Sequence, residues 1–177
     1  MGNMTVPAVS ALPDADLFKL AFRHHPAGIA VLTAQGGDGP VGLTASSVSS
    51  VSAEPPVLAF SVSTASASAA ALITADTLVV HLLGADQLEL ARLFATRGAD
   101  RFGGTTRWHT LPTGEPLLTD APWALRCAIL HRLPVGGSMI LAAEVVSVEQ
   151  SSDDAGHPPL VYHDRAYHRL TERSLLT

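Results

Sequence analysis

Short apolar runs separated by dense turn signals constrain the fold of this chain more than any other feature. Residues 28–33 form an apolar run rich in branched side chains, 36–40 read Gly-Gly-Asp-Gly-Pro, and a second extended run follows at 41–52. Glycine and proline at this density favour a tight turn, so the two runs are expected to pair as a hairpin. Residues 124–148 repeat the arrangement around a turn signal at 134–138. These hairpins predict an antiparallel sheet.

The remaining pattern predicts three helices among further strands. In chain order we expect a helix at 14–25 capped by Asp14, a strand at 57–63, a short helix at 66–74, a strand at 78–83, a helix capped by Asp86 and continuing to Phe94, and a short strand at 160–163. Six or seven strands with three interleaved helices favour a mainly β fold, an antiparallel barrel decorated by helices. A doubly wound parallel sheet would need regular alternation of strands and helices, which is absent here.

The length and charge pattern fit one soluble domain. A chain of 177 residues fits a single domain, expected at 14–177 after a flexible N-terminal segment at 1–13. Ten of the 11 basic residues are arginines, they form no basic stripe, and the net charge is −5, so nucleic acid is not expected as a partner. Neither a signal sequence nor an apolar run of about 18 residues is present, which predicts a cytoplasmic protein without a membrane partner.

The low content of charge indicates an oligomer. Charged residues make up 15% of the chain, against about 25% in an average soluble domain. Part of the surface is therefore expected to be covered by another subunit. Dilution of the charge by the many alanines is the alternative explanation.

Several kinds of catalytic or metal site are excluded. The chain has no phosphate-binding glycine loop of the Walker or dinucleotide type, no nucleophile elbow and no H-E-x-x-H zinc motif. Adjacent His24 and His25 would point about 100° apart on a helix, so they cannot share one metal ion. The single Cys127 excludes an internal disulfide and a multi-cysteine metal site, and favours a reducing compartment. No metal site is predicted.

Two polar segments carry the functional signal. The run at 44–52 is made almost entirely of small residues, and 44–47 in particular leave space above the backbone while offering amide and hydroxyl donors to a flat ligand. The stretch at 61–68 carries several serines where a strand leads into a helix N-terminus, which is an arrangement that binds phosphate. Ser63 or Ser66 acting only as a helix cap is the simpler alternative. Together, a planar heterocycle and a phosphate describe a flavin mononucleotide.

The chain also resembles a known family over most of its length, from Phe22 to about Leu170. The resemblance is carried by the ordered segments 26–33, 42–52 with Pro55-Pro56, 60–63 with Ser66, 93–95 with Arg101-Phe102, the strand around Cys127, 143–145, and 159–163 ending in Tyr167. These segments resemble the short-chain flavin reductases that serve two-component flavin-dependent monooxygenases. That resemblance implies the FMN-binding split β-barrel, an antiparallel barrel with helices.

The resemblance implies a role for each matching residue. The backbone of the first segment would contact the isoalloxazine and ribityl groups, and the serines of the second would line the ribityl-phosphate end. Arg101 and Phe102 would close over the cofactor, and Tyr167 would frame the site as a residue shared across the dimer. The cofactor-binding residues so implied are Thr44, Ala45, Ser46, Ser47, Val48, Ser61, Ser63, Ser66, Arg101, Phe102 and Tyr167. The alternatives are a solvated loop charge at Arg101 and ordinary core packing at Phe102 and Tyr167.

The reaction implied is hydride transfer from NADH or NADPH to N5 of FMN or FAD in a homodimer, with reduced flavin released to a separate monooxygenase. Such a transfer depends on alignment of two cofactors, so no catalytic side chain is expected. Backbone amides of residues 45–48 are expected to stabilise negative charge near N1 and O2 of the flavin. The shortage of lysine and arginine around 61–68 in the sequence predicts modest flavin affinity.

One position departs from the family pattern. Many members carry a histidine in the hairpin before the penultimate strand, where this chain has Ser138. The resemblance assigns that position to the nicotinamide side of the pocket. A non-catalytic flavin-binding or interaction protein on the same barrel is therefore the alternative function.

Overall fold

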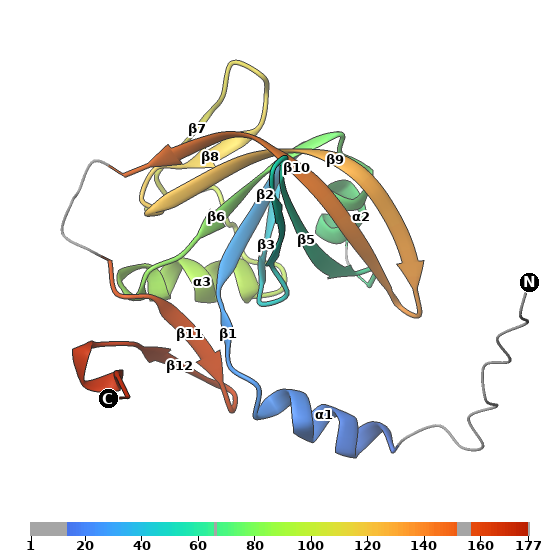
Figure 1. The fold of residues 1–177 in the computed structure, drawn as a ribbon. Coiled ribbons are helices and arrows are strands. Elements are labelled where there is room, and N and C mark those ends of the chain that lie inside the picture. Colours follow the sequence, from blue (N-terminus) through green and yellow to red (C-terminus); the bar gives the residue numbers. More distant parts are fainter. Residues whose placement is uncertain (1–13, 66, 152–156, 177) are drawn as a thin grey trace, which may run out of the picture.

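A computed structural model describes residues 14–65, 67–151 and 157–176 (Figure 1). The segment at 1–13, expected to be flexible, and Ser66 lie outside the described residues. The extent of the single domain at 14–177 stays a prediction.

The described fold is mainly β, as the sequence predicts, and its centre is one antiparallel sheet of seven strands in the order β3-β2-β6-β9-β10-β5-β4. Both predicted hairpins are present, β2 with β3 and β9 with β10. The strands of this sheet are β2 Ala30–Gly36, β3 Gly39–Ala45, β4 Ser49–Ala53, β5 Pro56–Ser63, β6 Thr77–Leu82, β9 Trp123–Val135 and β10 Ser138–Gln150.

Two small sheets flank the main one. β1 (Ala27–Gly28), β11 (Leu160–His163) and β12 (Ala166–Arg169) form a three-stranded sheet, and β7 (Trp108–Thr110) pairs with β8 (Pro116–Leu118). The sequence did not predict β1, β7, β8 or β12. Each has only two to four residues, too few for an alternating pattern to stand out.

The predicted strand at 41–52 is wrong as a single element. β3 ends at Ala45 and β4 begins at Ser49, and these two strands lie at opposite edges of the seven-stranded sheet. Residues 46–48 join those edges, and four Cα steps reach at most about 14 Å. The sheet must therefore curl until its two edges nearly meet. The small side chains at the break leave room for this crossing.

The three predicted helices are present: α1 Ala15–Arg23, α2 Ala67–Thr74 and α3 Leu88–Ala95. Asp14 caps α1 as predicted, accepting a hydrogen bond from the Asp16 amide at 2.8 Å. Asp86 does not cap α3. It lies in a 3₁₀ turn, Ala85–Gln87, and its carboxylate faces Arg169 at 3.1 Å. A second 3₁₀ turn, Glu172–Ser174, follows β12.

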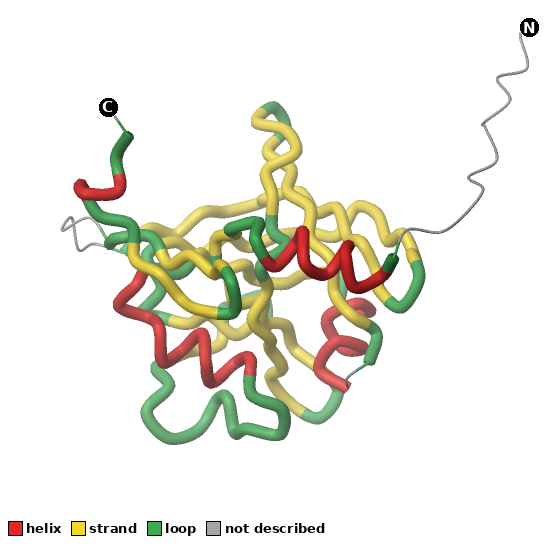
Figure 2. Tube along the Cα trace, turned by 90° about the horizontal axis from the view of Figure 1, so that it is seen from below, coloured by secondary structure: helices red, strands yellow, loops and turns green. Residues whose placement is uncertain are grey.

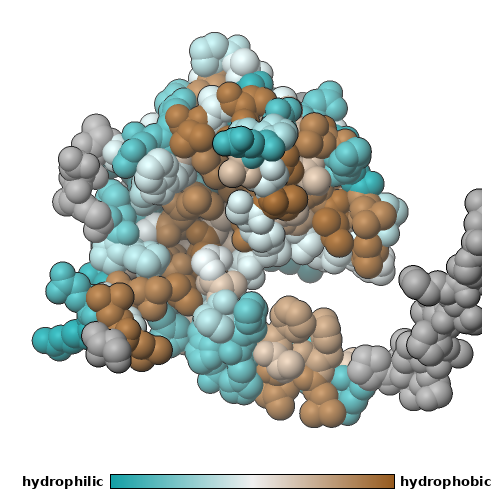
Figure 3. Space-filling model, in the orientation of Figure 1, coloured by the Kyte–Doolittle hydropathy of each residue, from teal (hydrophilic) through white to brown (hydrophobic). Residues whose placement is uncertain are grey.

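The helices differ in how they meet the sheet. α2 and α3 both contact β3, and Figure 2 shows them flanking the strands between. α1 extends away from the sheet and buries none of its residues (Figure 1). In Figure 3 its hydrophobic side chains face outward, with Leu17 65% and Phe18 57% exposed.

The core lies on both faces of β2, whose side chains alternate between two clusters. Leu32 packs with Phe60, Leu72 and their neighbours, whereas Val31 packs with the cluster under α3 that includes Phe94. The core thus holds β3, the strand next to β2, between α2 and α3, where the functional site is expected.

Candidate functional site

A groove with a volume of about 880 Å³ lies where β3, β5, α2 and the loop after α3 meet. It brings together residues from both polar segments singled out in the sequence. The predicted residues that line it are Thr44, Ala45, Ser46, Ser47, Ser61, Ser63, Arg101 and Ser138. Residues almost a hundred positions apart therefore share one surface.

Side-chain hydroxyls fix the floor of the groove to its surroundings. The Thr44 hydroxyl donates to the Ala91 carbonyl of α3 at 2.6 Å. The Ser47 hydroxyl donates to the Ser61 carbonyl and accepts from the Ser61 amide, both at 3.0 Å. These bonds hold the crossing at 46–48 against β5 without relying on bulky side chains. The floor is therefore a rigid surface of small residues, open above.

Gly42 allows α3 to come close to this floor. A Cβ atom there would lie 2.6 Å from Cε1 of Phe94 and 2.9 Å from the Leu32 carbonyl oxygen. Both distances are well inside van der Waals contact, so only glycine fits this position of β3.

Strand register places Ser138 next to Ser63. The two residues are direct partners between β10 and β5, and both line the groove. The adjacent turn is tied by Thr64, whose amide and hydroxyl donate to the Gly137 carbonyl at 3.0 and 3.1 Å. The serine predicted for the phosphate end and the serine predicted for the nicotinamide side therefore lie side by side. Their separate roles stay predictions.

Two arginines give this end of the groove a positive charge. Arg97 and Arg101 both line it, and no aspartate or glutamate is among its described lining residues. The sequence has few basic residues around 61–68, but in the folded chain the loop after α3 brings two arginines next to this segment. Modest flavin affinity stays a prediction.

Arg101 is held in place by three contacts. Its guanidinium donates to the Phe94 carbonyl at 3.2 Å, the Thr96 carbonyl at 2.7 Å and the Ser68 hydroxyl at 3.4 Å. The two carbonyls end α3, where a cation is favoured by unpaired acceptors and by the helix dipole. Arg101 is thus no freely solvated loop charge.

Three predicted residues lie outside the groove, and Ser66 is outside the described residues. Val48 lines a neighbouring hollow of about 700 Å³ at the base of α1, which shares Ser46, Ser47 and Ser61 with the groove. Phe102 and Tyr167 both pack on the core cluster under α3. The cofactor roles of all four stay predictions.

Aromatic neighbours account for the positions of Phe102 and Tyr167. The Phe102 ring lies between Phe94 and Trp108, at centroid distances of 5.4 and 5.2 Å. Tyr167 packs on Tyr162 at 5.0 Å, and burial raises the pKa of the Tyr167 hydroxyl. Both rings therefore have a structural role in the core of this chain.

Eight further residues line the groove without being predicted as site residues: Leu43, Val62, Ala65, Ser68, Phe94, Ala95, Arg97 and Gly98. Three of them, Val62, Ala65 and Ser68, lie within the polar stretch at 61–68. Arg97 lies in the same loop as Arg101, four residues earlier, so a second basic side chain in that loop was the available signal. The sequence places Phe94 in a helix and in the segment 93–95 that carries the family resemblance, but gives it no role in the site.

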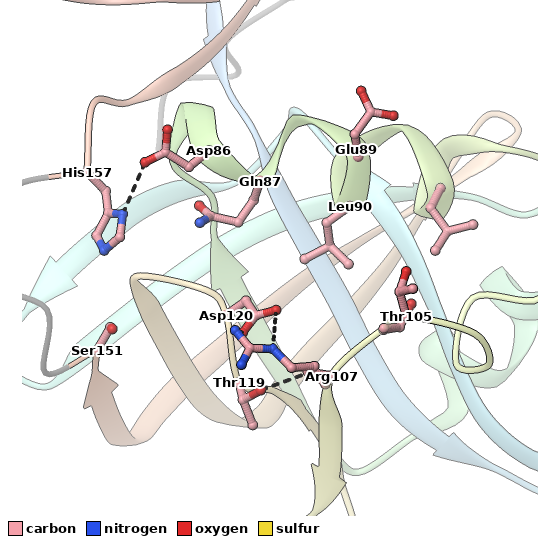
Figure 4. A pocket seen from close by; sticks show the side chains of 12 residues that line it. Asp86, Gln87, Glu89, Leu90, Thr105, Arg107, Thr119, Asp120, Ser151 and His157 are labelled. Carbon is pink, nitrogen blue, oxygen red and sulfur yellow. Dashed lines mark hydrogen bonds and ion pairs between the residues drawn. The ribbon is translucent and has the colours of Figure 1, made fainter.

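A second, smaller pocket lies beside α3 and the 3₁₀ turn that precedes it (Figure 4). It has a volume of about 520 Å³ and carries the carboxylates of Asp86, Glu89 and Asp120. Its one arginine, Arg107, donates to Asp120 at 3.0 Å, and His157 lies 3.6 Å from Asp86. Three carboxylates and one paired arginine disfavour an anionic ligand in this pocket.

Two absences bear on the kind of site. Within the described ranges, no three histidine, cysteine or acidic side chains are grouped so as to hold a metal ion. No helix in that part of the chain has the length and apolarity needed to cross a membrane.

Comparison with known proteins gives consistent similarities. Residues 22–171 match the model of the flavin reductase like domain. The chain is 41% identical over 173 residues to an NADH:FMN oxidoreductase of Rhodococcus qingshengii, covering 94% of this chain and 90% of that protein.

Solved structures show the same similarity. A flavin reductase domain protein from Arthrobacter sp. FB24 superposes with a TM-score of 0.81 at 36% identity, over 88% of this chain and 95% of that one. The NADH:FAD oxidoreductase SgcE6 of Streptomyces globisporus C-1027, solved in complex with NAD and FAD fragments, gives a TM-score of 0.79 at 29% identity, over 90% of this chain and 94% of that one.

Proposed function

The chain belongs to the flavin reductase-like family, and from that membership we propose that it is an enzyme that reduces a flavin with a nicotinamide cofactor. It is an NAD(P)H:flavin oxidoreductase, the class for which the similar proteins are named. The observation that carries the proposal is the groove itself. It joins a flat floor of small residues to an end with two arginines and no carboxylate among its described lining.

The groove residues fit a flavin in size and polarity. A volume of about 880 Å³ is within the range of cofactor sites. We assign the ring system to the floor at 44–48 and the phosphate to the end formed by Ser63, Ser68 and Arg101. Backbone amides of residues 45–48 are the donors proposed for the polar edge of the ring.

When bound, the flavin supplies N5, the atom that accepts the hydride of the nicotinamide. The part played by this chain is to bind and orient, which is why no acid or base is required in the groove. The rigid floor held by Thr44 and Ser47 supports that role. Ser138 is proposed to border the nicotinamide where relatives carry histidine.

The finer parts of the proposal concern partners and location. We propose that FMN or FAD acts as an exchangeable substrate, reduced by NADH or NADPH, and that the reduced flavin leaves for a separate monooxygenase. The open groove suits exchange. A cytoplasmic location is proposed from the sequence, in agreement with a buried, unpaired Cys127.

A homodimer is proposed from the surface of α1. This helix buries none of its residues, and its apolar side chains Leu17, Phe18 and Phe22 are each more than half exposed. A second copy of the chain that covers this face would bury the apolar patch, which would otherwise favour aggregation. Light scattering should then give about twice the monomer mass of 18.4 kDa, whereas the monomer mass would contradict the dimer and the shared role of Tyr167.

One assay tests the activity. Purified protein is mixed with NADH or NADPH and with FMN or FAD in air, and nicotinamide oxidation is followed by its absorbance. We expect a rate well above that of free flavin for at least one pair of cofactors. Flavin binding without any such rate would contradict the reductase and favour the non-catalytic flavin-binding protein.

A further inference from the structure

The arginines of this protein are almost all paired, and this makes the exceptions informative. Seven of the ten hold a hydrogen bond or an ion pair with a described residue, namely Arg23, Arg92, Arg101, Arg107, Arg126, Arg132 and Arg169. Within the described ranges, Arg97, Arg165 and Arg173 have no such partner. Of these three, only Arg97 lines the groove.

The two arginines of the groove therefore differ in how many of their N–H donors are free to bind a ligand. Arg101 gives its donors to the Phe94 and Thr96 carbonyls and to Ser68. Much of its charge is balanced by the C-terminal end of α3, and its contacts fix the course of the loop. Arg101 is on this basis a positioning residue. Arg97 keeps all five of its N–H donors for a ligand.

We propose that Arg97 recognises the phosphate monoester of FMN and makes the groove selective for FMN over flavins without that group. The inference rests on the proposed function, since it takes the groove to be the flavin site. The guanidinium can form two parallel hydrogen bonds to a phosphate, and such charge-assisted bonds are the strong ones. With no carboxylate among the described lining residues, nothing in the groove competes for that charge.

The charge of the ligand decides the order of preference. A phosphate monoester carries between one and two negative charges at neutral pH, and its second pKa lies near 6. In FAD the same phosphorus is part of a pyrophosphate linkage, so it carries one charge, has two terminal oxygens instead of three and is joined to a second charged phosphate, and riboflavin has no phosphate. Arg97 should therefore favour FMN most, FAD less and riboflavin not at all.

The test compares flavins on one variant. Dissociation constants of FMN, FAD and riboflavin are measured by quenching of flavin fluorescence, without nicotinamide, for the parent and for Arg97→Gln. We expect a loss of about tenfold for FMN, a smaller loss for FAD and no change for riboflavin. In turnover, KM for FMN should rise by a similar factor with kcat unchanged.

Arg165→Gln is the matched control, because it removes an unpartnered arginine from the turn between β11 and β12. It should leave all three constants unchanged, whereas a general effect of net charge would lower the affinity of FMN in both variants. The parent should also lose FMN affinity with added salt more steeply than riboflavin affinity, and Arg97→Gln should reduce that difference.

Two outcomes would overturn the inference while leaving the reductase in place. One is equal loss of FMN and riboflavin in Arg97→Gln, and the other is unchanged FMN binding in that variant. Failure of the parent to bind or reduce any flavin would instead overturn the proposed function and the inference together.

Discussion

The groove and the pocket of Figure 4 both include residues of α3 and are both lined by polar residues, yet they carry opposite charge. The described lining of the groove holds two arginines and no carboxylate. The pocket holds three carboxylates and a single arginine, which is paired with Asp120. Polarity alone therefore does not identify a site for an anionic cofactor. The balance of charge does.

The two regions are also stabilised differently. The groove is held by bonds from hydroxyls to the backbone, such as those of Thr44 and Ser47. The pocket is held by ion pairs between side chains, among them Arg107 with Asp120 and Arg169 with Asp86. A ligand can enter the groove without breaking an ion pair. This difference is the basis of the predictions below.

Acid should produce the largest effect, through buried His81 of β6. Its Nδ1 donates to the Val31 carbonyl of β2 at 3.1 Å and its Nε2 accepts from the Leu118 amide of β8 at 3.0 Å, next to Thr119 of the pocket. Burial lowers the pKa of His81 to about 4, although the hydrogen bond with Val31 opposes the shift. Protonation would leave Nε2 unable to accept from Leu118.

Stability should follow from the sign of that shift. The native state keeps His81 neutral while the unfolded chain titrates near 6.5, so the contribution is complete above that pH and is lost as pH falls toward 4. We expect a loss of about 3 kcal/mol between pH 7 and pH 4 by urea unfolding. Hydrogen exchange should show the Leu118 amide opening first. Constant stability over this range would contradict the neutral, buried histidine.

Glu115 adds to the loss only near and below pH 4.5, so its contribution can be separated from that of His81 by pH. Burial raises the pKa of this carboxyl, but hydrogen bonds with Arg126, Thr113 and Thr77 outweigh it and bring the pKa to about 2. Its stabilisation is present above its usual pKa near 4.5 and is lost as pH falls toward 2. The loss between pH 6.5 and 4.5 is therefore that of His81.

A single added methyl group on β3 should disrupt the close approach of α3 to β3 beneath the groove. Gly42→Ala would place a Cβ 2.6 Å from Phe94 Cε1, so α3 and the floor must separate. We expect a loss of about 2 kcal/mol in the free energy of unfolding and a clear loss of flavin affinity. Gly37→Ala is the control, since a Cβ there meets nothing within 4 Å. Equal stability of the two variants would contradict the packing described.

One carboxylate placed either in the groove or in the pocket tests directly whether the local charge governs flavin binding. Ser63→Asp adds negative charge to the groove, whereas Thr105→Asp adds it to the pocket. FMN affinity should fall about tenfold in the first variant and stay unchanged in the second. Fluorescence titration measures both. Equal losses would show that the overall charge of the protein, rather than the groove, governs binding.

The smallest effect is expected from the exposed ion pair of the pocket. Asp120→Asn removes the partner of Arg107, whose side chain is 75% exposed. Such pairs contribute at most about 1 kcal/mol, and FMN binding should not change. A fall in FMN affinity in this variant would indicate that the flavin binds in the pocket and not in the groove, which would contradict the assignment of the site.

Much of the fold could be predicted because its signals are local. The hairpins β2–β3 and β9–β10 follow from glycine and proline between apolar runs, and Asp14 caps α1 as its position suggests. The break at 46–48 could not be predicted, because it depends on the edges of the sheet meeting. Asp86 failed as a cap because a 3₁₀ turn precedes α3 and makes Gln87 its N-cap, and the Asp86 carboxylate pairs instead with Arg169, 83 residues away.

The small residues that form the floor of the groove could be predicted from the sequence, whereas its positive charge could be predicted only in part. The small residues at 44–47 and the serines at 61 and 63 stand out in the sequence, and the structure brings them into one groove. Arg97 and Arg101 reach that groove only through the course of the loop after α3. The surroundings of Phe102 are set by Phe94 and Trp108, which only the folded chain brings together.

A crystal structure of the protein with FMN tests the central claim most directly. We predict the isoalloxazine against residues 44–48 and the phosphate within hydrogen-bond distance of Ser63 or Ser68 and of Arg97. Phosphate density in the pocket of Figure 4, or in the groove but out of reach of Arg97, would contradict the account.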